Sequence, residues 1–428
     1  MTRSITQSEE SELELKKTLA GLKDFQQSTV NRLVALFNDP QGSHRVLVAD
    51  EVGLGKTIVA KGLIASMLLQ WREAKPLRVT YICSNLALAA ENSAKLAVFS
   101  GVHQDNWVRK PSYSRLAQVA LNPDSSQPSG ALLEICTLTP GTSFTLTRGA
   151  GNRDERAIIF CALLEHNRIR PWRNSLTDLF RERVQDVDGW EADLRAHETR
   201  GLDKVIVQSF HRKLIADDEN SLLERVLKAA RQRSFKHRDE HYKLLCDLRV
   251  RFAECCASNL QADLFILDEF QRFDTLLDQN QDNEQSLIAR QIFSNRQCNI
   301  LLLSATPFKA MTTVADDEND EGHLGKLQQI LTFLNLTPLD TYEPARKSLQ
   351  SELLRLRQDG VAVDELSNHP RHAVEQLLRP LILRTERSQI AVDVDTLVND
   401  APPRDRPQLH VGDGGPCALA GPGVVVSR

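Results

Sequence analysis

The sequence lacks a long apolar run, an excess of positive charge and a high content of aromatic residues. Aromatic residues make up only 5% of its 428 residues, and the formal net charge is −4. A membrane-spanning helix needs about 20 predominantly apolar residues, so nothing in the chain predicts a membrane partner. The negative balance provides no general attraction to nucleic acid, which leaves only a local surface for such binding.

The eight cysteines lack the spacing of a zinc site or of a disulfide framework. None of them forms a C-x-x-C pair, and most lie inside apolar segments, so we expect reduced thiols. The first residues, MTRSITQSEESELELKK, are polar and acidic instead of basic and then apolar, so they do not resemble a secretory leader. These features predict a cytoplasmic protein.

One stretch organises the rest of the chain, namely RVLVADEVGLGKTIVAKGLIA at residues 45–65. The apolar run Arg45–Ala49 predicts a strand, Gly53 and Gly55 interrupt it, and an apolar helical pattern begins at Lys56. A glycine-containing loop between a strand and a helix is the usual context of a phosphate-binding P-loop. The residues expected to bind the nucleotide are Asp50, Glu51, Val52, Gly53, Leu54, Gly55, Lys56 and Thr57.

Two residues of this loop have predicted chemical roles. Lys56 would neutralise charge on the β- and γ-phosphates, and the hydroxyl of Thr57 would bind Mg²⁺. Asp50 departs from the usual pattern G-x-x-x-x-G-K-[ST], because it stands where the first glycine is expected. An ordinary strand–turn–helix without a ligand is the alternative interpretation.

A predicted helix within Leu22–Phe37 begins with the pair Phe25 and Gln26. An aromatic ring beside an amide could stack on a purine and hydrogen-bond to it. Packing together with a helix-capping contact explains the same pair, and the sequence leaves both interpretations open.

Further buried strands are predicted along the chain, and helical patterns lie between them. These strands are Leu77–Cys83, Leu132–Leu138, Ala262–Leu267 and Asn299–Leu303. Alternating strands and helices predict an α/β fold with a parallel sheet, right-handed crossovers and helices on both faces. A large, charged, mainly helical insertion is expected at about 155–261, in which only Ala157–Leu164 and Lys204–Ser209 resemble strands.

Polar residues follow two of these strands at the edge where parallel sheets bind ligands. Ser84 and Asn85 follow the strand 77–83, and Thr139 and Ser143 follow the strand 132–138. All four could hydrogen-bond to the phosphodiester oxygens of a nucleic acid, while helix capping and a plain turn are the alternatives. The segment Glu224–Arg251 has more basic than acidic residues, which indicates either a solvated helix face or a phosphate-contacting surface.

A carboxylate pair, Asp268 and Glu269, ends the strand 262–267. Two acids at the end of a buried strand are costly unless a cation is near, and the predicted Lys56 and Mg²⁺ site would supply one. Asp268 would hold Mg²⁺, largely through water, and Glu269 would orient and deprotonate an attacking water. Capping of a following helix is the alternative.

The motifs DEVGLGKT, ICSN, DEFQ and SATP, in this order, resemble the first motor lobe of superfamily 2 helicases. The similarity is greatest to Swi/Snf-type and related bacterial DEAD/DEAH-like translocases, and LRPLILRTER resembles the segment that leaves this lobe. The resemblance covers residues 22–390 and implies a RecA-like lobe that binds ATP and Mg²⁺ and couples ATP hydrolysis to movement on nucleic acid, usually duplex DNA.

The resemblance also implies roles for single residues. Gln26 would contact adenine, and Ser304 and Thr306 would couple hydrolysis to movement. Gln271 departs from the His or Asp that is more usual at the fourth position of the DEFQ motif. Its amide could still bridge to Ser304 or to the γ-phosphate, so altered coupling is expected.

The predicted organisation has four parts: a flexible lead-in at 1–21, the ATP-binding lobe at 22–323, a helical exit segment at 324–390 and a disordered tail at 391–428. The family's second lobe, which supplies an arginine finger, is not predicted in this chain. A truncated or frame-shifted product and a split motor completed by another polypeptide are both open. The alternative function is a nucleotide-binding interaction module that does not act on nucleic acid.

Overall fold

The computed structural model describes most of the chain up to residue 385. The described residues are 5–51, 53–111, 115–123, 128, 130–143, 149–182, 184–216, 221–232, 238–270, 284–293, 298–304, 323–335, 339–359 and 368–385. They all belong to one compact unit, Met1–Glu386. The predicted tail at 391–428 lies outside the described residues, and so does the end of the predicted exit segment.

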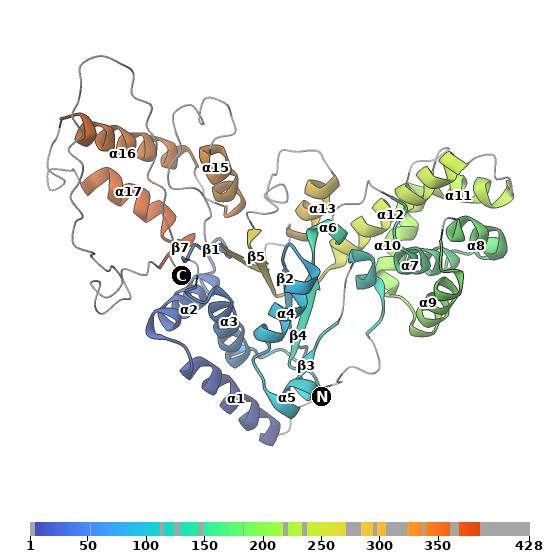
Figure 1. Ribbon diagram of the computed structural model, residues 1–428, viewed down its shortest axis with the longest axis horizontal. Helices are drawn as coiled ribbons and strands as arrows, with labels where there is room; N and C mark the ends of the chain where they lie inside the picture. Colours follow the sequence, from blue (N-terminus) through green and yellow to red (C-terminus); the bar gives the residue numbers. More distant parts are fainter. Residues whose placement is uncertain are drawn as a thin grey trace, which may run out of the picture. The chain divides into compact units, whose positions relative to one another are not determined.

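Seven strands form one parallel sheet in the order β3-β4-β2-β5-β6-β1-β7 (Figure 1). The strands are β1 Arg45–Val48, β2 Leu77–Ile82, β3 Val108–Arg109, β4 Leu133–Leu138, β5 Leu264–Asp268, β6 Asn299–Leu303 and β7 Ile382–Leu383. The predicted α/β fold, with a parallel RecA-like sheet and a large helical insertion, is confirmed. In this order β6 lies between β5 and β1, the strand before the predicted P-loop.

Helices cover both faces of the sheet. Successive residues of a strand point to opposite faces, so one strand contributes apolar side chains to both core clusters. In β6, Leu301 and Leu303 belong to one core cluster, whereas Ile300 and Leu302 belong to the other. The first cluster packs under α1 Ile5–Ala20, α2 Asp24–Phe37, α3 Lys56–Gln70 and α4 Leu86–Leu96. The second packs under the insertion and under α13 Glu284–Phe293 and α15 His323–Phe333.

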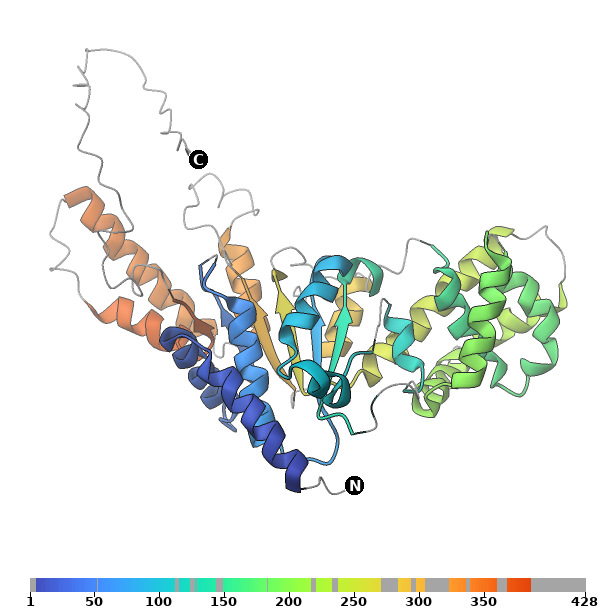
Figure 2. The ribbon, with the colours of Figure 1, turned by 60° about the horizontal axis from the view of Figure 1, so that its bottom comes forward.

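Within the predicted flexible lead-in at 1–21, a helix is expected only around Leu13–Leu19, whereas residues 5–20 form α1. This helix packs against α3 (Figure 2). Leu15 is buried in the first core cluster, and the hydroxyl of Thr18 donates a hydrogen bond to the carbonyl of Val98 at 3.0 Å. Tertiary contacts therefore hold a segment whose polar composition suggested fraying.

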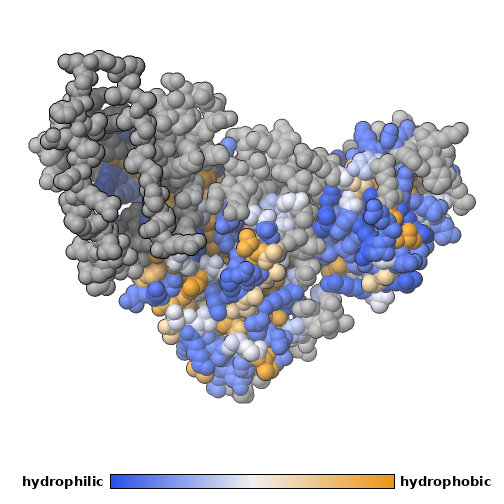
Figure 3. All heavy atoms as spheres, viewed as in Figure 1, coloured by the Kyte–Doolittle hydropathy of each residue, from blue (hydrophilic) through white to orange (hydrophobic). Residues whose placement is uncertain are grey.

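The insertion consists of helices over its described residues. They are α7 Arg153–Leu164, α8 Arg173–Arg181, α9 Val187–Arg200, α10 Lys204–Ile215, α11 Leu222–Arg231 and α12 Arg238–Asn259, with a short 3₁₀ helix η2 at Arg170–Trp172. Before the insertion, a five-residue 3₁₀ helix η1 spans Leu116–Ala120. The surface of the insertion seen in Figure 3 is mainly hydrophilic.

Both segments of the insertion that resembled strands are helices. Residues 157–164 lie in α7, where the Asn152 side chain accepts a hydrogen bond from Glu155 N at 2.9 Å. Residues 204–209 lie in α10, which Asp203 caps by accepting from Val205 N at 2.8 Å. A short continuous apolar run does not distinguish a buried strand from a buried helix, and here the N-caps and packing decide for the helix.

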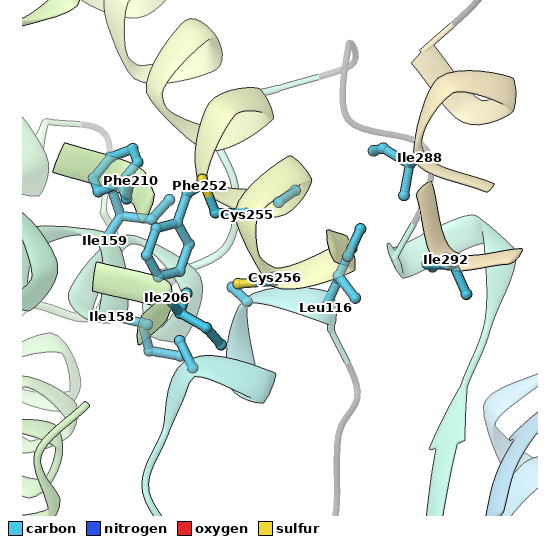
Figure 4. Close-up of a cluster of buried hydrophobic side chains, with 14 of the residues drawn as sticks. Leu116, Ile158, Ile159, Ile206, Phe210, Phe252, Cys255, Cys256, Ile288 and Ile292 are labelled. Atoms are coloured by element: carbon cyan, nitrogen blue, oxygen red, sulfur yellow. The ribbon is translucent and has the colours of Figure 1, made fainter. Parts of the chain in front are cut away.

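The insertion shares its core with one face of the sheet. Figure 4 shows apolar side chains of α7, α10 and α12 packed together, among them Ile159, Phe210 and Phe252. The rings of Phe210 and Phe252 meet edge to face with their centroids 5.0 Å apart. Leu302 of β6 belongs to the same cluster. The insertion is therefore anchored to the sheet by continuous apolar packing.

The predicted helical exit segment at 324–390 is only partly helical over its described residues. It contains α15, α16 Leu339–Asp359 and α17 Asn368–Leu378, but Ile382 and Leu383 form β7 at the sheet edge beside β1. Pro380 follows α17, and proline cannot continue a helix without losing a backbone hydrogen bond. No helix of the described residues is long and apolar enough to cross a membrane.

Candidate functional site

The loop between β1 and α3 has the backbone conformation that a phosphate-binding loop needs. Gly53 and Gly55 adopt positive φ values of 86° and 80°, a region that L side chains rarely occupy. Gly55 is the N-cap of α3, so the helix begins at Lys56 with its free N–H groups toward the loop. A Cβ at Gly55 would be strained by this positive φ, and it would also displace the side chain of Gln26, whose Nε2 would lie 2.7 Å away.

Asp50 does not need to be glycine. Among the described residues other than glycine, positive φ values occur at His44, Glu269 and Asn335, and Asp50 is not one of them. The departure from the usual P-loop pattern therefore falls at a position where the backbone accepts a side chain. Val52, between Glu51 and Gly53, lies outside the described residues.

Gln26 holds this loop by a hydrogen bond. Its Nε2 donates to the carbonyl of Leu54 at 3.0 Å, and its Oε1 accepts from Lys23 N at 3.1 Å. The side chain is buried, and Phe25 beside it is half-buried. The capping interpretation is thus realised, while contact with adenine stays a prediction.

Lys56 points back at the loop. Its Nζ donates to the carbonyls of Asp50 at 3.0 Å and Glu51 at 3.1 Å. Burial lowers the pKa of Lys56, and the charges of Asp50, Asp268 and Glu269 oppose that effect. The structure therefore brings the predicted lysine and the predicted carboxylate pair together, with Thr57 in the next position of α3.

The carboxylate of Asp50 joins the loop to β7. Two backbone bonds connect the strands: Leu47 N donates to Leu381 O at 2.8 Å and Ala49 N to Leu383 O at 2.7 Å. At the next step Thr385 N donates to Oδ1 of Asp50 at 2.7 Å. Asp50 is fully buried, and burial raises its pKa, although hydrogen bonds from Thr385 and the charge of Lys56 lower it in part.

Asp268 ends β5 at the same rim and has a buried tyrosine as its partner. Tyr81 of β2 donates from its hydroxyl to Oδ2 of Asp268 at 2.5 Å, and Asn92 of α4 donates to the Tyr81 hydroxyl at 2.8 Å. Glu269, next in the chain, has a φ of 52°, an uncommon conformation that turns it away from the strand direction. Gln271 lies outside the described residues.

Tyr81, Asn92 and Thr385 were not among the predicted site residues. Tyr81 lies within the predicted buried strand 77–83, and the structure places it in the core. A weak signal was present, since a buried tyrosine hydroxyl usually requires a hydrogen-bond partner. Nothing in the local sequence identifies that partner as Asp268.

The other residues predicted at this edge of the sheet differ in burial and in their hydrogen bonds. Ser304 is buried and its N–H donates to the carbonyl of Val48 at 3.1 Å, directly before the loop, whereas Thr306 lies outside the described residues. Asn85 caps α4, since its side chain accepts from Ala87 N at 2.7 Å. The capping alternative for Asn85 is therefore present in the structure.

Ser84, Thr139 and Ser143 follow two adjacent strands, because β2 and β4 pair in register from Leu77 and Leu133 to Ile82 and Leu138. Ser84 is half-buried, Thr139 is buried, and Ser143 is fully buried within the short helix α6 Pro140–Ser143. A hydroxyl without exposed surface reaches a nucleic-acid backbone only if the turn moves. Contact with nucleic acid stays a prediction for all of these residues.

The basic segment 224–251 uses several of its charges internally. Arg225 pairs with Asp247 at 2.7 Å, and Arg249 lies 2.9 Å from Glu155 with both side chains 3% exposed. Arg251 pairs with Glu254 at 3.2 Å. These arginines are therefore poor candidates for a phosphate-contacting surface.

No protein-family model and no curated protein matches the chain. Among solved structures, the chain is similar to the SWI2/SNF2 ATPase core of Sulfolobus solfataricus in complex with dsDNA, at 13% sequence identity and a TM-score of 0.35. The match covers 86% of this chain and 45% of that protein, so the chain spans less than half of its length. A likeness of this strength carries no argument about function, which is argued below from the site itself.

Proposed function

We propose that this chain is the ATP-binding lobe of a helicase- or translocase-type ATPase. It binds ATP with Mg²⁺ and, together with a second lobe, couples hydrolysis to movement on nucleic acid. One observation carries the proposal: Lys56 follows the left-handed Gly55 at the start of α3, and the charges of Asp268 and Glu269, from a distant part of the sequence, act on it. This combination of one lysine and two acids at a helix N-terminus suits a metal-bound triphosphate.

The residues present fit such a ligand. Lys56 is held by two carbonyl oxygens, which are neutral acceptors that anionic phosphate oxygens can replace. Mg²⁺ usually keeps several waters and takes one or two protein ligands plus substrate phosphates, so Thr57 and Asp268 suffice. Bound Mg²⁺ would neutralise charge that develops on the β- and γ-phosphates.

Glu269 is the proposed general base. It follows Asp268 directly, and its backbone is in the left-handed region with a φ of 52°. In this arrangement Asp268 serves the metal, while Glu269 orients the attacking water and accepts its proton. Gln26 contributes by holding the loop at Leu54, which keeps Lys56 and Thr57 at the start of α3.

A nucleotide-binding interaction module is the second candidate function. The net charge of −4 favours it, as do the internal ion pairs of the insertion, because both reduce the attraction to nucleic acid. The two candidates share the nucleotide site and differ in their response to DNA.

The test is single-turnover ATP hydrolysis by the full chain, with and without duplex DNA at low salt. We expect ATP–Mg²⁺ binding but slow hydrolysis, far below the rate of about 1 s⁻¹ or more of complete phosphoryl-transfer enzymes, because an arginine finger contributes roughly 10³–10⁵ in rate. DNA should stimulate turnover once a second lobe is supplied. No stimulation would favour the interaction module, and no ATP binding would contradict both candidates.

Glu269→Gln separates binding from chemistry in the same assay. The variant should keep ATP binding and lose hydrolysis, because the amide cannot accept the proton of water. Glu91→Gln is the matched control, since Glu91 is exposed on α4 and pairs only with Lys95 among the described residues. Hydrolysis by Glu269→Gln at the parent rate would show that Glu269 is not the base.

A further inference from the structure

Tyr81 occupies an unusual position for a core residue, because its ring lies in the core and its hydroxyl reaches the candidate site. The side chain is fully buried in the cluster under α2, α3 and α4. Its hydroxyl donates to Oδ2 of Asp268 at 2.5 Å and accepts from Nδ2 of Asn92 at 2.8 Å. Three elements, β2, β5 and α4, thus meet in one chain of hydrogen bonds.

The chemistry of the three groups sets the direction of this chain. An amide N–H can only donate, and a phenol hydroxyl has a single proton. Asn92 therefore occupies a lone pair of the Tyr81 oxygen and leaves the proton for Asp268.

The hydrogen bond from Tyr81 occupies Oδ2 of the Asp268 carboxylate and does not involve Oδ1. Within the described residues no hydrogen bond or ion pair reaches Oδ1 of Asp268. Asp268 is the last residue of β5, and β5 runs parallel to β6 and β1, so it lies at the same edge of the sheet as the loop that follows β1. A rigid, buried ring that holds Oδ2 would leave Oδ1 for a ligand at that edge.

We propose that Tyr81, fixed by Asn92, is a positioning residue that orients Asp268 for a Mg²⁺-bound water. This inference rests on the proposed function, because the Mg²⁺ site is part of it. Removal of a partner that orients a metal-ligating group typically lowers metal affinity or activity about 10–100-fold. A hydroxyl that only satisfied its own burial would affect folding and leave the Mg²⁺ response unchanged.

The experiment measures binding of a fluorescent, non-hydrolysable ATP analogue to the full chain by anisotropy. The analogue is titrated without Mg²⁺, and Mg²⁺ is then titrated at a fixed analogue concentration. The variants are Tyr81→Phe, which removes only the hydroxyl, and Asn92→Ala, which removes only its donor. Tyr342→Phe is the matched control, because Tyr342 is also buried but lies on α16 in the other core cluster.

We expect Tyr81→Phe to raise the Mg²⁺ concentration needed for half-maximal binding about 10–100-fold. Asn92→Ala should raise it by less, since the bond from Tyr81 to Asp268 remains. Affinity for the analogue without Mg²⁺ should not change, and Tyr342→Phe should behave like the parent chain.

Two results would overturn the inference: a Mg²⁺ response of Tyr81→Phe equal to that of the parent, or an equal loss of analogue affinity with and without Mg²⁺. If Tyr81→Phe does not fold, the Asn92→Ala variant tests the inference by the same two criteria, because Asn92 is only half-buried. A parent chain that binds no analogue would refute the proposed function itself. Binding without any response to Mg²⁺ would remove the Mg²⁺ site and this inference with it.

Discussion

The carboxyl rim of the sheet and the helical insertion both bury charged side chains, but they satisfy them differently. In the insertion, Arg249 pairs with Glu155 and also donates to the carbonyl of Gly149 at 3.1 Å. At the rim, the described hydrogen bonds of Lys56 go to backbone carbonyls. Charges that pair with each other contribute to the fold, whereas charges held by neutral groups stay available to a ligand.

The largest effect is expected from the buried ion pair of the insertion. Glu155→Ala leaves Arg249 buried without its counter-charge, which should cost about 3–5 kcal/mol of the free energy of unfolding. Urea denaturation measures this loss. Glu12→Ala is the control, because Glu12 and Lys16 are 53% and 64% exposed, and it should leave stability nearly unchanged. Similar losses for both variants would show that burial does not distinguish the pairs.

At the rim, Lys56→Ala should have the opposite profile. Affinity for ATP–Mg²⁺ should fall about 10–100-fold, since hydrogen bonds to charged groups contribute about 1.5–3 kcal/mol. The free energy of unfolding should not fall, because burial already disfavours the charged form of Lys56. Isothermal titration and urea denaturation measure the two quantities, with Lys16→Ala as an exposed control. Unchanged ATP affinity would mean that the loop is not a phosphate site.

A smaller effect is expected from Asp50, where the rim meets the exit segment. Asp50→Gly restores the usual P-loop pattern but removes the acceptor for Thr385 N, whereas Asp50→Asn keeps an oxygen acceptor. Hydrogen exchange of residues 381–385 should therefore accelerate in Asp50→Gly, by about 10-fold or more, and less in Asp50→Asn. Equal exchange in Asp50→Gly and the parent would show that the contact does not hold β7.

The smallest expected effect is an opposite dependence of stability on pH in the two regions. Burial raises the pKa of Asp50, so its contribution to stability is greatest in acid and falls as pH rises from about 3.9, the ordinary value, through the raised one. Asp154 of the insertion is half-buried, and its desolvation alone would raise its pKa, but His197, Gln118 and Arg153 lower it overall. Its contribution is present above about 3.9 and is lost as pH falls through the lowered value.

Urea denaturation of Asp50→Asn and Asp154→Asn across this acidic range tests the two signs. Relative to the parent, Asp50→Asn should gain stability as pH rises, whereas Asp154→Asn should lose it. Parallel curves for the two variants would contradict the difference between the regions.

Local sequence patterns specify the α/β class, the main strands and the glycine loop. Apolar, β-branched runs such as Arg45–Val48 and Asn299–Leu303 are local patterns, and both are strands of the sheet. Gly53 and Gly55 mark positive φ values, which is also a local property. The roles assigned to Lys56, Asp268 and Glu269 remain predictions, although the structure brings these residues together.

The conformation of ambiguous apolar runs and the partners of buried polar groups depend on long-range contacts. Residues 157–164 became helical because their cap and packing outweighed local propensity. The bonds from Tyr81 to Asp268 and from Thr385 to Asp50 span 187 and 335 residues of sequence. Such contacts depend on which strands are neighbours and in which register, and no local pattern contains that information.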